Sequence, residues 1–475
     1  MRLYTKVLFS ILFYILTIKP VSAQRFLGTS TGEWNAMSSL YLNPANIADC
    51  REQFSINILS LNFDVNNSLG TFSKFGEYSA TSPNTFKITG TKDFNMIIPD
   101  VEIHGPGIMY SINKKHSLAL TTGFRLMNQF NNFDPSLYKI IMDPGSAPAS
   151  NFKVNSKNFN WTANMWTEVG LTYGAVILDN EKNEIKVGIT LKKLFGIGYV
   201  SVTGNNINVA YKTDSNVLYA TNTDLEFASN VVNDNTAIFK GLDAGNFLSR
   251  IFGSTAGGGL SADIGVVYKR RIGESEPSDY MESTTTHDLV LSASVTDFGS
   301  INYSNSTNAN IQVTGNGYLS GQGISQNANN SAAFLNYVKQ QGFTADTMSK
   351  GNRVFLPTAL LLSADMQITG HIFGDLLYIN NLANRMNFGN SYYNQFTFTP
   401  RYDKHNMSFA LPITYSMLSN DIKVGVCYRI AGFFIGSDDM LAFTHKNQRG
   451  FDLYLGGYIP IFKINNDPAG IHWSD

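Results

Sequence analysis

The sequence predicts an all-β fold, a transmembrane antiparallel β-barrel that crosses a membrane with its strands. Three observations predict it: apolar residues recur at every second position, charged residues are only 15% of the 475 residues, and aromatic residues reach 13%. A period of two is typical of a strand with two unlike faces. A soluble sandwich needs more charge on its outer face. We therefore expect the aliphatic face to contact lipid and the small polar face to line a lumen.

The first 23 residues have the pattern of a secretory signal peptide. Arg2 and Lys6 are positively charged, residues 7–18 are apolar, and small residues stand at Val21 and Ala23 before the expected cleavage site. The alternative is an uncleaved anchor. No later stretch is long and apolar enough for a helical membrane span. Strands are therefore the expected crossing elements.

Alternating segments of about 9 to 12 residues recur from about residue 54 onward, which is long enough for a tilted strand to cross the hydrocarbon core. Strands of soluble domains are mostly shorter, at about 5 to 6 residues. One example is NEIKVGITLKK, residues 183–193, which is expected to form a hairpin with residues 166–179. Because lipid offers no hydrogen-bond partners, such strands must close into a barrel.

The segments without alternation are predicted to be loops or helices. Four long polar stretches are expected to be outside loops. They are residues 142–160, 213–235, 272–286 and 302–330. Helical spacings predict loop or lumen-plugging helices at residues 236–252 and 332–340.

Charged side chains on the small polar face would lie in the lumen. Two functions remain open for them: they line a path for a solute, or they form a polar network that stiffens the barrel. In the predicted register they are Glu168, Lys186, Lys192, Asp263, Asp365 and Arg429.

Several functional classes are disfavoured. A net charge of −1 without a basic stripe argues against nucleic-acid binding. No G-x-S-x-G nucleophile elbow and no phosphate loop with a following Lys-Ser or Lys-Thr occurs. The seven histidines are scattered, without the spacing of a zinc site. The sequence therefore predicts a protein that is not an enzyme and that carries no metal or cofactor.

The tripeptide Asn43-Pro44-Ala45 stands between the signal peptide and the first clear strand. By itself it predicts a turn, because proline excludes helical dihedrals for the preceding asparagine. At this position it resembles the N-terminal hatch motif of the long-chain fatty acid transporter (FadL) superfamily of outer-membrane barrels. Later stretches resemble a family of uncharacterised outer-membrane barrels related to that superfamily and to the secretion-associated barrel PorV. Among them are GGGLSADIGVVYK (257–269), FLPTALLLSADMQI (355–368) and FDLYLGGYIPIF (451–462).

The resemblance implies a barrel of about 14 strands whose lumen is plugged by an N-terminal hatch. The expected organisation is a signal peptide at 1–23, a hatch at 24–52, a barrel with long extracellular loops at 53–464 and a tail at 465–475. Asn43, Pro44 and Ala45 would then lie inside the barrel.

The resemblance also has a consequence for the two cysteines. Cys50 would approach the wall from the hatch, and Cys427 has lumenal parity, so a disulfide between them is conceivable. Two buried thiols are the alternative.

The resemblance further implies a function, because some members of the superfamily pass hydrophobic molecules. We expect a Gram-negative outer-membrane protein surrounded by outer-membrane lipid that serves as a passive, porin-like channel or binding protein for a small hydrophobic ligand. The alternative is a non-transporting anchor or scaffold that docks secreted or periplasmic proteins or a secretion complex. A secreted soluble β-sandwich is a third class.

Overall fold

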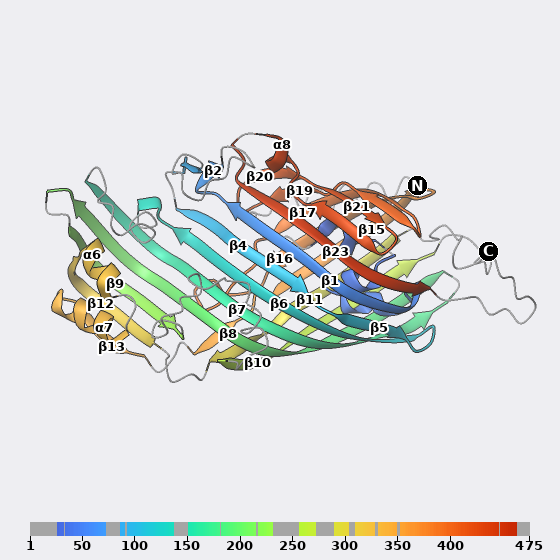
Figure 1. Cartoon of the computed structure of the whole chain (residues 1–475), viewed down its shortest axis with the longest axis horizontal. Helices are drawn as coiled ribbons and strands as arrows, with labels where there is room; N and C mark the ends of the chain where they lie inside the picture. Colours follow the sequence, from blue (N-terminus) through green and yellow to red (C-terminus); the bar gives the residue numbers. More distant parts are fainter. Residues whose placement is uncertain are drawn as a thin grey trace, which may run out of the picture.

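Fourteen antiparallel strands close into a barrel, as the sequence predicted (Figure 1). The structure is a computed structural model. It describes residues 26–32, 34–72, 86–90, 93–136, 151–180, 182–214, 217–230, 256–271, 289–303, 309–327, 331–348, 352–445 and 447–462. The predicted signal peptide with its cleavage site and the predicted tail lie outside the described residues.

The first wall strands in chain order are β1 (Glu52–Asn67), β4 (Phe94–His104) continued by β5 (Gly107–Ser111), β6 (His116–Phe133), β7 (Phe152–Asp179), β8 (Asn183–Lys212), β10 (Gly257–Arg270) and β11 (Leu289–Tyr303). They are followed by β15 (Ala359–Thr369), β16 (Ile372–Asn381), β17 (Gln395–Asp403), β18 (Met407–Ala410) continued by β19 (Ile413–Ser416), β20 (Asp421–Val424) continued by β21 (Val426–Ile430), β22 (Phe433–Ser437) and β23 (Gly450–Phe462). The barrel closes because β1 pairs with β23 on one side and with β4 and β5 on the other.

The two ends of the barrel differ. Short turns at 112–115, 370–371, 404–406 and 431–432 join strands at one end, where β1 also begins and β23 ends. We call this the turn end and the opposite end, with the longer connections, the loop end. In transmembrane barrels the short turns face the periplasm and the long loops face outward.

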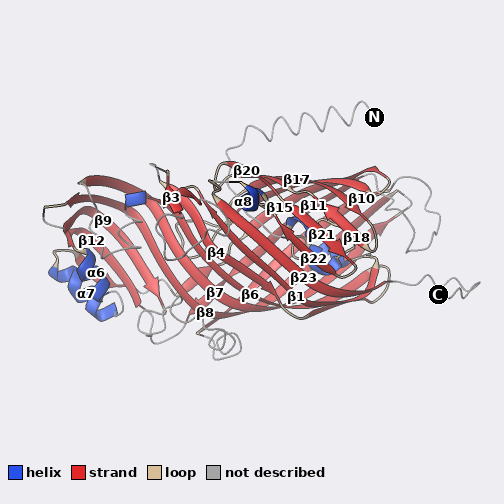
Figure 2. Cartoon of the chain, turned by 45° about the horizontal axis from the view of Figure 1, so that its top comes forward, coloured by secondary structure: helices blue, strands red, loops and turns tan. Residues whose placement is uncertain are grey.

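The outer face of the wall is apolar and the inner face is polar. Leu191 and Ile264 point outward and are each 59% exposed, whereas Thr172 and Thr190 point inward and are buried. The predicted assignment of faces is therefore correct. No helix in the described part of the chain is long and apolar enough to span a membrane. Figure 2 shows how much of the molecule is strand and how short the helices are.

Two strands are much longer than predicted and leave the barrel at the loop end. β7 has 28 residues and β8 has 30. The part of β8 nearer the turn end pairs with β10, and its other part pairs with β9 (Val217–Ser229). β9 pairs with β12 (Ala309–Leu319), which pairs with β13 (Thr344–Thr347). We call this part, with helices α6 (Gly321–Asn327) and α7 (Ser331–Gln340), the extension (Figure 1).

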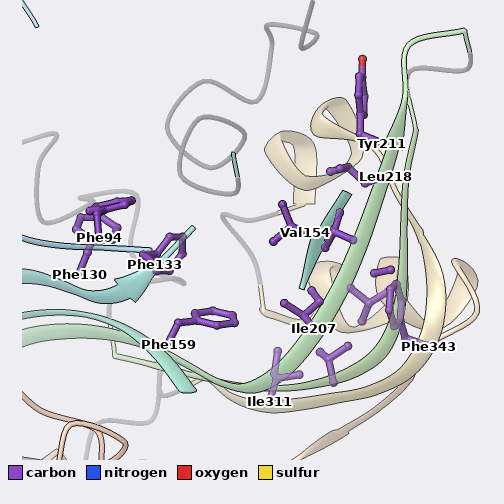
Figure 3. Close-up of a cluster of buried hydrophobic side chains, with 14 of the residues drawn as sticks. Phe94, Phe130, Phe133, Val154, Phe159, Ile207, Tyr211, Leu218, Ile311 and Phe343 are labelled. Atoms are coloured by element: carbon purple, nitrogen blue, oxygen red, sulfur yellow. The ribbon is translucent and has the colours of Figure 1, made fainter. Parts of the chain in front are cut away.

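The extension has its own hydrophobic core. Val154, Ile207, Leu218, Ile311 and Phe343 pack together there, and the cluster continues to phenylalanines at the loop end of the barrel (Figure 3). The prediction of loops at 142–160, 213–235 and 302–330 was therefore wrong in large part. These stretches contain many polar residues, but alternate positions are apolar and bury a second core. Helix α7 confirms the predicted helix at 332–340.

The predicted outside loop at 272–286 also needs correction. Arg270, at the end of β10, pairs with Leu289, at the start of β11, and both lie at the turn end. The connection therefore leaves from the end opposite to the predicted one. Residues 272–288 themselves lie outside the described residues, as does the predicted helix at 236–252.

The remaining elements are small and lie around the loop end. β2 (Gly70–Phe72) and β3 (Phe86–Ile88) form a hairpin, and α8 (Leu441–Thr444) precedes β23. β14 (Arg353–Phe355) pairs with the part of β11 nearer the loop end, and β15 pairs with the part nearer the turn end.

Candidate functional site in the barrel lumen

The segment before β1 folds as three short helical turns that are largely buried. They are α2 (Leu27–Ser30), α3 (Ala36–Ser39) and the 3-10 turn η1 (Pro44–Ile47). Asparagines cap two of them: Asn35 accepts a hydrogen bond from the amide of Ser38 at 3.1 Å. Asn43 accepts one from the amide of Ala45 at 3.0 Å. Pro44 suits the first position of such a turn, where no amide hydrogen is needed. We call residues 26–51 the hatch.

Asn43 also fastens the hatch to the wall. Its side-chain nitrogen donates to the main-chain oxygens of Val266 on β10, at 3.1 Å, and Ala293 on β11, at 3.2 Å. On the inner face of the wall, η1 lies against Gly188 and Gly265. A Cβ atom on Gly188 would lie 2.3 Å from the nitrogen of Ala45, and one on Gly265 would lie 1.9 Å from Asn43 Oδ1. Only glycine leaves room there for the hatch.

A second set of bonds holds the start of the hatch to the opposite part of the wall. The amide of Leu27 donates to Asp438 Oδ2 at 3.1 Å, and the amide of Gly28 donates to the Tyr454 hydroxyl at 3.2 Å. The Tyr458 hydroxyl donates to the main-chain oxygen of Trp34 at 2.7 Å. The hatch is therefore attached on two sides by a small number of hydrogen bonds.

The two cysteines do not form the disulfide that the resemblance makes conceivable. Both are buried thiols that are not bonded to each other. Cys50 lies beside Met109, at 3.9 Å between the sulfur atoms, whereas Cys427 packs with Phe26 and Tyr454 in a separate cluster. Cys50 lies in the hatch and Cys427 on the inner face of β21. Parity, however, does not determine which part of the circumference a residue faces.

The structure buries all six sequence-predicted charges on the inner face but divides them among separate networks. Three of them meet at Lys192. Its Nζ lies 2.8 Å from Asp263 Oδ2, 2.8 Å from Asp297 Oδ1 and 3.9 Å from Glu168 Oε1. Arg125 completes this network through Asp297 Oδ2 at 2.8 Å.

Asp297 was missed by the sequence analysis. It lies within a register shift of the β10–β11 ladder, where Thr296 and Asp297 together stand opposite Asp263 and the simple alternation breaks. Its φ of 57° and its buried side chain are the signs of that irregularity. Asn or Asp at positive φ is a recurring choice, yet sequence alone does not indicate where a bulge falls.

The other three predicted charges lie elsewhere. Arg401 binds both oxygens of Asp365, at 2.8 and 2.7 Å. Arg429 lies 3.2 Å from Asp403, and Lys186 lies 3.1 Å from Glu184. Lys186 also donates to the main-chain oxygen of Asp49 in the hatch at 3.4 Å. The partners Arg401, Asp403 and Glu184 were not predicted.

The connection between β16 and β17, residues 382–394, enters the lumen, and we call it the inward loop. Asn390 Nδ2 donates to the main-chain oxygens of Met127 and Thr162, at 3.1 and 3.2 Å. Gln129 Nε2 donates to the main-chain oxygen of Ser391 at 2.8 Å. The Tyr392 hydroxyl contacts both Arg125 and Asp297. The inward loop therefore reaches across the lumen to β6 and β7.

An apolar cluster joins the hatch to the inward loop. Leu27 and Leu42 of the hatch belong to the same buried cluster as Tyr392 and Tyr393 of the inward loop. Leu418 of the β19–β20 connection and six wall residues complete it: Ile97, Met127, Ala359, Leu361, Leu377 and Ile379. A second inner cluster combines Phe388 of the inward loop with Trp166 and Tyr303. Open porins have polar lumens, so an apolar interior at this place is a distinguishing property.

Among the described residues, no group of three or more His, Cys, Asp or Glu side chains is arranged to hold a metal ion. The charged groups named above are all in ion pairs.

A closed barrel with an apolar outer belt, an N-terminal hatch and an inward loop defines a plugged transmembrane β-barrel. The chain belongs to the family described as Family of unknown function (DUF5723), whose profile matches residues 44–438. An uncharacterised family is what the sequence motifs led us to expect.

Solved structures of similar proteins include two toluene transporters. TbuX of Ralstonia pickettii is 9% identical, with 89% of this chain and 93% of that chain covered and a TM-score of 0.38. TodX of Pseudomonas putida is 9% identical, with 93% and 98% covered and a TM-score of 0.34. A FadL homologue of Pseudomonas aeruginosa is 9% identical, with 90% and 93% covered and a TM-score of 0.29. No curated protein matches the chain.

Proposed function

We propose that this protein is an outer-membrane barrel that binds small hydrophobic molecules and lets them pass without energy coupling. The observation that carries the proposal is the apolar cluster between the hatch and the inward loop, where Leu27 and Leu42 meet Tyr392. A polar solute gains nothing from such a lining, whereas burial of apolar surface stabilises an apolar solute by about 25 cal/mol per Å².

Passage requires the hatch or the inward loop to shift. Several of the hydrogen bonds that hold them join neutral groups, such as those of Asn43 and Asn390. Each such bond contributes about 1 kcal/mol, so a bound solute can offset a few of them. The Lys192 network, with its paired charges, would act as a stiffening frame around this path. The chain would reach the outer membrane after cleavage of the signal peptide near Ala23. The proposed route for the solute runs from the loop end to the turn end.

Tryptophan fluorescence tests the binding step. A variant that keeps only Trp166, with Trp34, Trp161 and Trp473 replaced by Phe, reports on the inner clusters, because Trp166 is fully buried there. We expect saturable quenching by 12-bromododecanoic acid that dodecanoic acid reverses by competition. The matched control keeps only Trp161, which packs against the core of the extension and should show no saturable quenching.

Whole-cell accumulation of radiolabelled naphthalene tests passage. Cells that display the barrel should accumulate it faster than cells without it. Non-saturable quenching that is equal at Trp166 and Trp161, together with equal accumulation, would contradict the proposal.

The extension favours a scaffold as the second candidate function. It stands beyond the barrel at the loop end and has a folded core of its own. Photo-crosslinkers at the exposed Asn155 and Asn205 should capture one defined secreted protein if the extension docks a partner. A crosslinker at the outward wall residue Leu260 is the control.

A further inference from the structure

Two buried amide side chains lie side by side in the lumen, one on the wall and one on the inward loop. Asn164 stands on the inner face of β7 and is 0% exposed. Asn390 of the inward loop is 2% exposed and donates through Nδ2 to the main-chain oxygens of Met127 and Thr162. Met127 is the ladder partner of Asn164, so Asn390 is held next to Asn164. We call Asn164 and Asn390 the amide pair.

Each member of the amide pair has one polar atom without a hydrogen-bond partner in the part of the chain that the structure describes. These atoms are the donor Asn164 Nδ2 and the acceptor Asn390 Oδ1. The other atom of each amide is engaged, since Asn164 Oδ1 accepts from the Tyr303 hydroxyl at 2.8 Å. A buried polar group without a partner costs free energy, and most such groups in folded proteins are paired. The two atoms therefore point to a ligand that can both accept and donate a hydrogen bond.

The surroundings of the amide pair are apolar. In the inward loop, Asn390 stands between Phe388, which belongs to the inner cluster of Trp166, and Tyr392, which belongs to the cluster of the hatch. Trp166 follows Asn164 by two positions on the same face of β7. Apolar walls with a few fixed polar atoms are the usual composition of a small-molecule site.

The unpaired atoms become accessible when the inward loop moves. In the closed barrel both atoms are buried, and the side-chain nitrogen of Asn390 joins the loop to β6 and β7. The shift of the inward loop that passage requires would separate Asn390 from Asn164 and leave room between them. A molecule that enters there can pair with both atoms.

We propose that the molecule bound between the hatch and the inward loop is an apolar compound with one neutral hydroxyl group. Its oxygen accepts a hydrogen bond from Asn164 Nδ2, its hydrogen is donated to Asn390 Oδ1, and its apolar body lies against Trp166 and Phe388. The inference rests on the proposed function and names the class of molecule that the barrel passes.

The amide pair disfavours two other classes of molecule. A pure hydrocarbon leaves both atoms unpaired. A carboxylate accepts from Asn164 but has no hydrogen to donate to Asn390 Oδ1. A site whose buried polar groups bind a hydroxyl discriminates strongly against the analogue that lacks it.

Competition in the variant that keeps only Trp166 tests the donor. Bound 12-bromododecanoic acid quenches Trp166, and the concentrations of cyclohexylmethanol and of methylcyclohexane that restore half of the fluorescence are compared. The two competitors share a ring and differ in the hydroxyl group. Asn164→Leu should lower the ratio of the hydrocarbon concentration to the alcohol concentration about tenfold, equivalent to about 1.4 kcal/mol. Partition into micelles cancels, because the ratio is compared between proteins in the same detergent.

A second variant and a control accompany this measurement. Asn164→Ala removes the same donor with a smaller side chain and should lower the ratio as well. Thr172→Val removes a buried hydroxyl from the inner face of β7 nearer the turn end and should keep the ratio. Heat-modifiable migration in gels verifies that every variant is folded.

The methyl ether of cyclohexylmethanol tests the acceptor. The ether is more apolar than the alcohol and would bind more tightly through apolar contact alone, but it has no hydrogen to donate. We expect it to displace the quencher less well than the alcohol does, because Asn390 Oδ1 then stays unpaired.

Two results would overturn the inference. An unchanged ratio in both Asn164 variants shows that this amide does not contact the ligand, and an ether that binds as tightly as the alcohol shows that Asn390 Oδ1 accepts nothing from it. In both cases the competitors still displace the quencher, so the proposed function stands. Displacement by none of the three compounds would contradict the inference and the proposed function together.

Discussion

Asn43 Nδ2 donates a hydrogen bond to the main-chain oxygen of Val266 at 3.1 Å, across the boundary between the hatch and the wall. The same nitrogen reaches Ala293 on the next strand at 3.2 Å. One side chain thus bridges β10 and β11 while its oxygen caps the turn at Ala45. The asparagine of the Asn43-Pro44-Ala45 motif serves both the local turn and the attachment of the hatch.

Replacing Asn43 by Ala should loosen the hatch. The change removes the donor to two wall oxygens and the acceptor for the Ala45 amide, and we expect a loss of about 2–4 kcal/mol in local opening free energy. Hydrogen exchange of residues 36–48 measures it. Asn155→Ala, at an exposed position on β7, should leave this exchange unchanged. Unaltered protection in the Asn43 variant would show that other contacts hold the hatch.

Gly188→Ala should displace η1 without touching the lipid face. The added Cβ would lie 2.3 Å from the nitrogen of Ala45, which is main chain and cannot rotate away. Overpacking of this kind is destabilising by about 1–3 kcal/mol. The midpoint of heat unfolding, followed by gel migration, should fall. Gly258→Ala is the matched control, because its nearest neighbour would lie at 3.8 Å. A smaller effect at 188 than at 258 would refute the close fit.

Lys192→Met should destabilise the barrel strongly. The lysine lies 2.8 Å from both Asp263 and Asp297, and its loss leaves buried carboxylates with too little positive charge. Removing one partner of a buried ion pair typically destabilises by about 3–5 kcal/mol. Urea unfolding in detergent measures the change. Lys193→Met, on the outward face next to it, should shift the free energy of unfolding by less than about 0.5 kcal/mol.

Both thiols should be unreactive in the folded barrel and free after unfolding. Cys50 and Cys427 are buried in different clusters and are not bonded to each other. Iodoacetamide should modify two cysteines per chain in denaturant without prior reduction, which mass spectrometry counts. A mass increase that needs dithiothreitol would indicate a disulfide.

Acid should weaken the contact of the hatch with the turn end. His405 lies between β17 and β18, with its ring 5.4 Å from that of Trp34. Burial, and then the positive charge of Arg429, lower the pKa of His405. The unfolded chain then binds the proton more readily than the folded barrel. The stability that neutral His405 contributes to the folded state is therefore complete above the ordinary pKa of about 6.5 and is lost as the pH falls below it.

The fluorescence of a variant that keeps only Trp34 reports this change. It should shift between about pH 7 and pH 5, and His405→Gln should abolish the shift. A pH profile that persists in the glutamine variant would assign the change to another group.

The sequence by itself determined the barrel and its two faces. A period of two assigns each residue to lipid or lumen wherever the strand is regular, so Leu191 faces outward and Lys192 inward. That periodicity is local, and a strand displays it whatever its neighbours are.

The tertiary structure alone decided which inward residues meet. Arg125 and Asp297 are 172 positions apart and are joined only through barrel closure and a bulge. The entry of residues 382–394 into the lumen and the separation of the two thiols depend in the same way on positions around the circumference. The physical reason is that alternation fixes only the face of each residue. Register and closure, which are set by contacts distant in sequence, fix its neighbours.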